Sequence, residues 1–454
     1  MSVAPLNSAV TLLRTIKHAS CAGIAGLVFF SPGSLFADDS NVLRQVESLQ
    51  KENEELKNLV RQQGSVIEKL NERVNNLEKN NTPKSQTGEA TEAKPPKSSG
   101  FSLGRINISG EGGVGFFDSQ KNGIFPNNEF RVDEAKLFVE APIWGDVYFF
   151  TEINLAQRHD SGVDVDVGEL YLDFEDVSKL WGQDRQLNIR VGRTDVPFGE
   201  EYLTRDAIDN PLISHSVTDF WGVDEGVELY GTLGGVNYIV AVQNGGVPVA
   251  RDFNKDKSVI GRVSYDPTRW LHLSVSGMRT GDLDAAADRD YLSELWFGGG
   301  WFRSIGSAST TKFHAELVQG DIAVHCPHGH LKAYGGYAHY DDDDPLGDNQ
   351  RDIYFYTVEG IGNITRKLYA AARFSEIFVH NGYPLPGNGD MGQYFFNPFG
   401  PQAEVLWRLS LGLGYRFSKN LVLKAEYSFE QAKEVSGATR DDVNFFGAEA
   451  AFAF

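Results

Sequence analysis

The stretch Trp407-Arg408-Leu409-Ser410-Leu411-Gly412-Leu413-Gly414-Tyr415-Arg416-Phe417 has a large apolar residue at every odd position and Arg, Ser or Gly at every even one. A period of two is typical of a β-strand with one apolar and one polar face. After the turn at 418–420 the pattern returns, and it recurs at the end of the chain. The apolar positions there are Leu421, Leu423, Ala425, Tyr427, Phe429, Phe446, Ala448, Ala450, Phe452 and Phe454.

The same alternation occurs at 147–155, 170–174, 187–192, 226–230 and 259–265, with connections that alternate between short and long. The chain has 48 Gly, 12% aromatic residues and a mean hydropathy of -0.31. A helical membrane protein is excluded, because no run of 18 or more apolar residues follows the N-terminus. Residues 101–454 therefore predict an antiparallel transmembrane β-barrel, in which only alternate residues face lipid. The segmentation gives about 17 strands, and such barrels need an even number. Sixteen strands are expected, with eighteen as the alternative, and the uncertain segment lies between about 290 and 350.

Residues 1–37 have the features of a secretory signal peptide. Arg14, Lys17 and His18 precede an apolar core at 19–30, and Leu35-Phe36-Ala37 forms a cleavage site. We therefore expect the barrel in the outer membrane and the following segment in the periplasm.

Residues 38–80 contain a heptad repeat from 42 to 77 that predicts a coiled-coil oligomerisation helix. Its core positions are Val46, Asn53, Val60, Ile67 and Val74 with Val42, Leu49, Leu56, Gln63, Leu70 and Leu77. The polar Asn53 and Gln63 would fix the register, and the pattern leaves two or three strands open. Residues 81–100, rich in Pro, Ser and Lys, predict a flexible linker.

The segment 187–230 has two one-sided strands separated by a loop of about 25 residues. Loops of that length are usually functional or disordered, and this one predicts a segment that folds into the lumen. Its candidate constriction residues are Arg193, Glu200, Glu201, Arg205, Asp206, Asp209 and Asp219. Strand parity predicts a basic set on the lumenal wall at Arg105, Arg190, Arg262, Arg373, Arg408, Arg416 and Lys424.

The stretch Gly192-Arg193-Thr194-Asp195-Val196-Pro197-Phe198-Gly199-Glu200-Glu201-Tyr202-Leu203-Thr204 resembles a pattern of the phosphate-selective porin O and P family, with weaker likeness at 261–265, 368–374 and 409–429. The resemblance implies a sixteen-stranded trimeric barrel whose third extracellular loop constricts the pore. It also implies a preference for phosphate-like anions, carried by a lumenal arginine ladder and by lysine at the constriction. This chain departs from that pattern, because its loop is acidic and no Lys lies between Gln186 and Asn254.

The expected function is passive diffusion of small hydrophilic solutes and ions, with a weak preference for phosphate or similar anions. The alternatives are a cation-preferring general porin and a structural barrel that tethers the envelope through the coiled coil. The expected partners are outer-membrane lipid, two further copies of the chain and small solutes such as phosphate.

Several classes of function are not expected. No nucleophile–base–acid set can be assembled, so we expect neither an enzyme nor a cofactor. A net charge of -20 argues against nucleic-acid binding. The cluster His325-Cys326-Pro327-His328-Gly329-His330 has donors that suit Zn or Cu, but its spacing is too tight for one tetrahedron, and an ordinary loop is favoured.

Overall fold

The computed structural model describes residues 101–454 apart from 104, 122, 124, 157–164, 246–251, 253, 286–308, 348, 384–402 and 441–442. The predicted signal peptide (1–37), coiled coil (38–80) and linker (81–100) lie outside the described residues and stay predictions. None of the described helices has the length and apolar character needed to cross a membrane. The described chain consists of β-strands, turns, loops and two short 3-10 helices.

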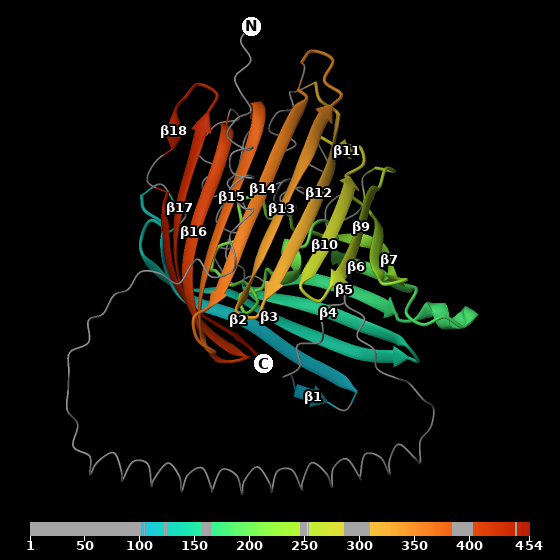
Figure 1. Ribbon diagram of the computed structural model, residues 1–454. Helices are drawn as coiled ribbons and strands as arrows, with labels where there is room; N and C mark the ends of the chain where they lie inside the picture. The colour runs from blue at the N-terminus through green and yellow to red at the C-terminus, as the bar shows by residue number, and fades with distance from the viewer. Residues whose placement is uncertain are drawn as a thin grey trace, which may run out of the picture. The chain divides into compact units, whose positions relative to one another are not determined.

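The elements follow one another along the chain as drawn in Figure 1. Their bounds are β1 (Phe101–Leu103), β2 (Ile106–Asp118), β3 (Glu129–Trp144), β4 (Val147–Ala156), β5 (Asp166–Phe174), η2 (Val177–Trp181), β6 (Asn188–Asp195), η3 (Glu201–Thr204), β7 (Val223–Leu233), β8 (Val236–Gln243), β9 (Ser258–Thr268), β10 (Leu271–Arg279), β11 (Leu283–Asp284), β12 (Lys312–Cys326), β13 (Gly329–Asp342), β14 (Arg351–Asn363), β15 (Leu368–Tyr383), β16 (Ala403–Ser418), β17 (Leu421–Glu434), β18 (Thr439–Arg440) and β19 (Phe445–Ala453).

The sheet closes on itself as an antiparallel barrel. Sequential long strands pair with each other, and β19 pairs with β2, so that Ala450 faces Val114. The strands β1, β11 and β18 have only two or three residues and pair with β2, β12 and β17. Without them, sixteen of the nineteen strands form the ring, which confirms the expected count. Closure pairs the backbone of every strand on both sides, as a sheet within lipid requires.

The alternation predicted for the last hairpin is confirmed. Leu411, Leu413 and Phe417 are exposed on the outside of the ring, whereas Arg408 and Ser410 are buried inside it. The partner strand β17 has the same arrangement, with buried residues at every second position.

The two ends of the barrel differ in their connections. At one end, here called the short-turn end, two residues join β3 to β4, β7 to β8, β9 to β10, β12 to β13 and β16 to β17. Gly234 and Gly235 have φ values of 59° and 88°, which the tight turn between β7 and β8 requires and other residues rarely adopt. The His325–His330 segment forms another of these turns, between β12 and β13. The connection between β5 and β6, which contains η2, also lies at this end, whereas the other long connections, including that between β6 and β7, lie at the opposite, long-loop end.

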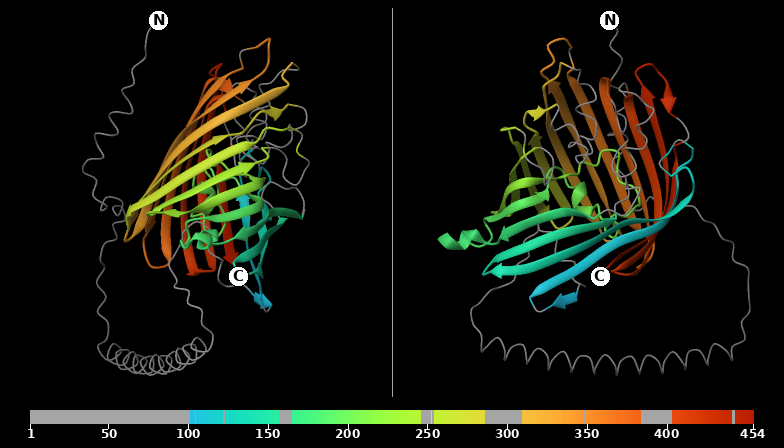
Figure 2. Two further views of the ribbon diagram at one scale, coloured as in Figure 1. Left: turned by 90° about the vertical axis from the view of Figure 1, so that its right-hand side faces the viewer. Right: turned by 180° about the vertical axis from the view of Figure 1, so that it is seen from behind.

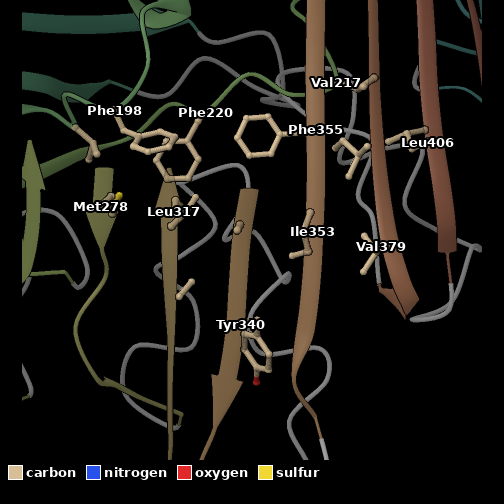
Figure 3. Packing of buried hydrophobic residues seen from close by; sticks show 14 of the residues in the cluster. Phe198, Val217, Phe220, Met278, Leu317, Tyr340, Ile353, Phe355, Val379 and Leu406 are labelled. Atoms are coloured by element: carbon tan, nitrogen blue, oxygen red, sulfur yellow. The ribbon is translucent and has the colours of Figure 1, made fainter. Parts of the chain in front are cut away.

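Residues 196–222, here called the inner loop, connect β6 to β7 and lie inside the ring. The turned views in Figure 2 show this loop between the wall of β3 to β5 and the wall of β12 to β14. Its Phe198, Val217 and Phe220 belong to a buried cluster with wall residues such as Leu317, Phe355 and Leu406 (Figure 3). Part of the lumenal face beneath the loop is therefore apolar, although strand parity predicts polar residues on that face.

Candidate pore constriction

The inner loop is bonded to widely separated strands of the ring. The Gly199 amide donates to Ser276 Oγ of β10 at 3.0 Å, and the Val217 amide donates to Ser375 Oγ of β15 at 3.0 Å. On the other side of the lumen, the Ala207 amide donates to Glu134 Oε1 of β3 at 2.5 Å. The loop therefore narrows the lumen and is fixed at points on both walls.

Four wall cations hold the loop by donating to its backbone carbonyls. These contacts are Arg262 to Gly199 (2.6 Å), Arg373 to Ser214 (2.7 Å), Arg408 to His215 (2.9 Å) and Lys424 to both Ala207 (2.7 Å) and Leu212 (2.9 Å). All four side chains are buried. Four of the seven residues that strand parity placed in a basic set on the lumenal wall thus lie beneath the inner loop.

Three of these cations also face a buried carboxylate on the neighbouring strand. The pairs are Arg373 with Glu359, Arg408 with Glu430 at 2.5 Å and Lys424 with Glu449 at 3.0 Å. Removing a charge from water is costly unless it is paired and hydrogen-bonded. Each cation meets that condition through one carboxylate and at least one loop carbonyl, so its charge is largely neutralised.

Glu426 binds the backbone donors of the loop, whereas the four cations bind its backbone acceptors. Its carboxylate accepts the amides of Ile213 at 2.5 Å and Ser214 at 2.8 Å, and also the Ser214 hydroxyl. Together with Lys424, it satisfies donors and acceptors of one buried turn. Glu426 and Lys424 therefore hold the loop mainly through its backbone amides and carbonyls. Contacts of this kind do not depend on which side chains the loop has at these positions.

The acidic residues of the loop are mostly bonded as well. Asp219 pairs with Arg205 at 2.6 Å, and Asp206 pairs with Lys136 of β3 at 2.8 Å. Glu200 accepts from His272 at 2.9 Å. Glu201 accepts from the Ser216 amide and hydroxyl at 3.0 and 2.6 Å and from Tyr334. Asp209 is exposed.

Two of these carboxyls stay ionised despite burial. Burial opposes ionisation of Asp219, but the charge of Arg205 and the hydrogen bond from His215 hold its pKa below the usual value. Burial also acts on Glu200, whose pKa is nevertheless lowered by the hydrogen bond from His272 and by the charge of Arg262. The loop therefore keeps fixed negative charges at neutral pH.

On the wall of β3 to β7, each of two cations is shared between two carboxylates. Lys136 lies 2.8 Å from Asp206 and 3.9 Å from Glu152. Arg190 lies 2.9 Å from Asp173 and 3.5 Å from Glu228. Because one positive charge faces two negative ones in both places, each of these two sites has an excess of negative charge.

The remaining candidates lie elsewhere. Arg193 is buried at the end of β6, where it faces Glu225 of β7 in the strand register. Arg416 lies near the short-turn end, 4.2 Å from the Tyr369 ring, and donates to Asn363 at 3.2 Å. Arg105 is exposed in the turn before β2 and is not part of a strand, contrary to the parity assignment.

Sequence reasoning missed Lys136, Glu359 and Tyr334, which bond the loop or its anchors. A signal was present at Lys136, because it interrupts the apolar residues of 135–139. The structure describes the turn at 325–330. Among all described residues, including the His and Cys residues of this turn, there is no group of three or more His, Cys, Asp or Glu that could hold a metal ion.

The comparisons with known proteins agree with the barrel fold. No family model and no curated protein match the sequence. The outer membrane channel DcaP of Acinetobacter baumannii has a TM-score of 0.52 and 13% identity, covering 77% of this chain and 97% of that chain. In-vitro folded OmpT, an outer membrane protein of Vibrio cholerae, has a TM-score of 0.52 and 12% identity, covering 79% and 100%. At such identities the likeness shows the fold alone, and the resemblance to the phosphate-selective family stays a prediction.

Proposed function

We propose that this chain is an outer-membrane channel through which small hydrophilic solutes diffuse passively, with a preference for cations. A closed barrel with an apolar exterior and a loop fixed across its lumen supports a channel rather than an enzyme. The short-turn end would face the periplasm, as in bacterial barrels generally. The proposal keeps the predicted trimer and the periplasmic coiled coil at 38–80.

The preference for cations is carried by one observation, the distribution of ion partners around the inner loop. Arg373, Arg408 and Lys424 each have a carboxylate and a loop carbonyl. On the opposite wall, Lys136 and Arg190 are each shared by two acids. Fixed charge of one sign favours passage of the opposite ion. We therefore favour the cation-preferring alternative over the weak anion preference expected from the sequence.

The test is the reversal potential of the purified protein in a planar bilayer under a KCl gradient. We expect a reversal potential whose sign shows that potassium passes more readily than chloride. The double variant Glu152→Gln with Glu228→Gln should bring this potential closer to zero. Asp184→Asn is the matched control, because Asp184 is an exposed acid in the connection between β5 and β6. Chloride preference, together with block of the chloride current by added phosphate, would overturn this proposal in favour of the anion channel. A folded protein that never conducts would favour the tethering barrel.

A further inference from the structure

A pocket of about 120 Å³ lies beside the inner loop, between η3 and the lumenal faces of β12 to β15. The acidic and basic residues that line it are Glu200, Glu201, Asp321, Lys332, Glu359 and Arg373. Pockets for drug-sized ligands have volumes of roughly 300–1,000 Å³. This pocket is therefore suited to a small polar solute.

Most charges in the pocket already have partners within the protein. Arg373 is bonded to Glu359 and to the Ser214 carbonyl. Glu201 is bonded to Tyr334 and Ser216, and Glu200 is bonded to His272. These groups form the frame of the pocket, because a solute could bind them only by displacing an existing partner.

Two groups of opposite charge type in the pocket, Asp321 and Lys332, have fewer bonding partners than the others. Asp321 Oδ1 accepts from Gln319 at 2.8 Å, but its buried Oδ2 has no hydrogen-bond partner among the described residues. Lys332 forms no ion pair within 4 Å with any described side chain. It acts electrostatically on Glu359, which is already bonded to Arg373. A carboxyl group and an ammonium group are thus available on the same pocket wall.

The strand register places these two groups at a useful separation. Asp321 faces Tyr334 and Lys332 faces Ala323, so Asp321 and Lys332 are diagonal neighbours on adjacent strands. Diagonal neighbours on one face of a sheet are roughly 7–8 Å apart. A small molecule between them can therefore present a cationic group to one and an anionic group to the other.

We propose that this pocket is a binding subsite for small zwitterionic solutes of the amino-acid class. The solute ammonium donates to Asp321 and the solute carboxylate accepts from Lys332. This inference rests on the proposed diffusion channel and names a solute class that the channel favours. Charge-assisted hydrogen bonds at both ends would distinguish a zwitterion from a neutral molecule of the same size.

The experiment compares uptake of L-alanine with uptake of lactamide, its neutral isostere, by liposome swelling with the full-length protein. We expect L-alanine to enter faster at low concentration and to saturate. Asp321→Asn and Lys332→Met should each weaken the apparent alanine affinity by about tenfold or more, the loss that one charged hydrogen bond represents. Lactamide uptake should not change. Asp343→Asn, in the loop between β13 and β14, is the control and should leave both rates unchanged.

Conductance in KCl, measured on the same preparation, separates this inference from the proposed function. A conducting channel with equal alanine and lactamide rates would overturn the subsite alone. Competition by methylammonium as strong as by alanine, with no effect of Lys332→Met, would replace it with a simple cation site. Absence of conductance would overturn both proposals.

Discussion

Replacing Arg408 by Met should destabilise the barrel strongly, because it would leave a carboxylate unpaired in a buried place. Arg408 is 2% exposed and binds Glu430 through two nitrogens, at 2.8 and 2.5 Å. It also satisfies the carbonyl of His215 at 2.9 Å. Breaking a buried ion pair by removing one partner costs about 3–5 kcal/mol. We expect a loss of that size in the free energy of unfolding, measured by denaturant titration of the protein refolded into lipid vesicles.

Two further variants test the physical reason for this loss. In Arg408→Met with Glu430→Leu, no unpaired charge stays behind, so the double variant should be more stable than Arg408→Met alone. Lys433→Met is the matched control, since it breaks an exposed pair between the same two strands, Lys433 with Glu404 at 3.4 Å. That pair should contribute only about 0–1 kcal/mol. If Arg408→Met lost no more stability than Lys433→Met, the role of Arg408 in fixing the inner loop would be refuted.

Three other predictions concern Asp219 of the inner loop, the aromatic residues Phe452 and Phe454, and the predicted coiled coil. Folding lowers the pKa of Asp219, so this residue stabilises the folded state above its usual pKa of 3.8 and that stabilisation is lost as the pH falls below 3.8. The variant Asp219→Asn should therefore lose less stability in acid than the unaltered protein does. The measurement is the free energy of unfolding at pH 7 and at lower pH. Removing Phe452 and Phe454 should cause periplasmic accumulation, measured by cell fractionation, and an unchanged outer-membrane yield would contradict this. Deleting residues 40–80 should weaken the oligomer but spare barrel folding, and mass analysis showing a monomeric isolated segment would contradict the coiled-coil prediction.

The fold could be predicted from the sequence because its main determinant is local. Each strand must place every second residue against lipid, so the period of two is visible in short segments such as 407–417 and 421–430. The need for closure then converts an uncertain count into an even number. Between 290 and 350, where the count was open, the described residues contribute the two long strands β12 and β13.

The inward apolar residues could not be predicted in the same way. Several apolar residues on the inner face of the barrel are buried away from water. They are Ile353, Phe355, Ile377 and Val379. Strand parity alone suggests water on that face. The structure instead brings Phe198, Val217 and Phe220 of the inner loop onto these strands, more than 130 residues away in the sequence. Which inward residues meet water depends on the path of the loop, and no local period records that path.

The same dependence changes the meaning of the wall cations. From the sequence, Arg373, Arg408 and Lys424 are inward positive charges, and inward positive charges favour anions. In the folded chain each is buried beside a carboxylate, and each also donates to a carbonyl of the inner loop. A paired, buried cation contributes little to the field in the passage, whereas Lys136 and Arg190, each facing two acids, leave negative charge unbalanced. The proposed preference for cations therefore rests on how the charges are paired, and a count of inward arginines does not determine it.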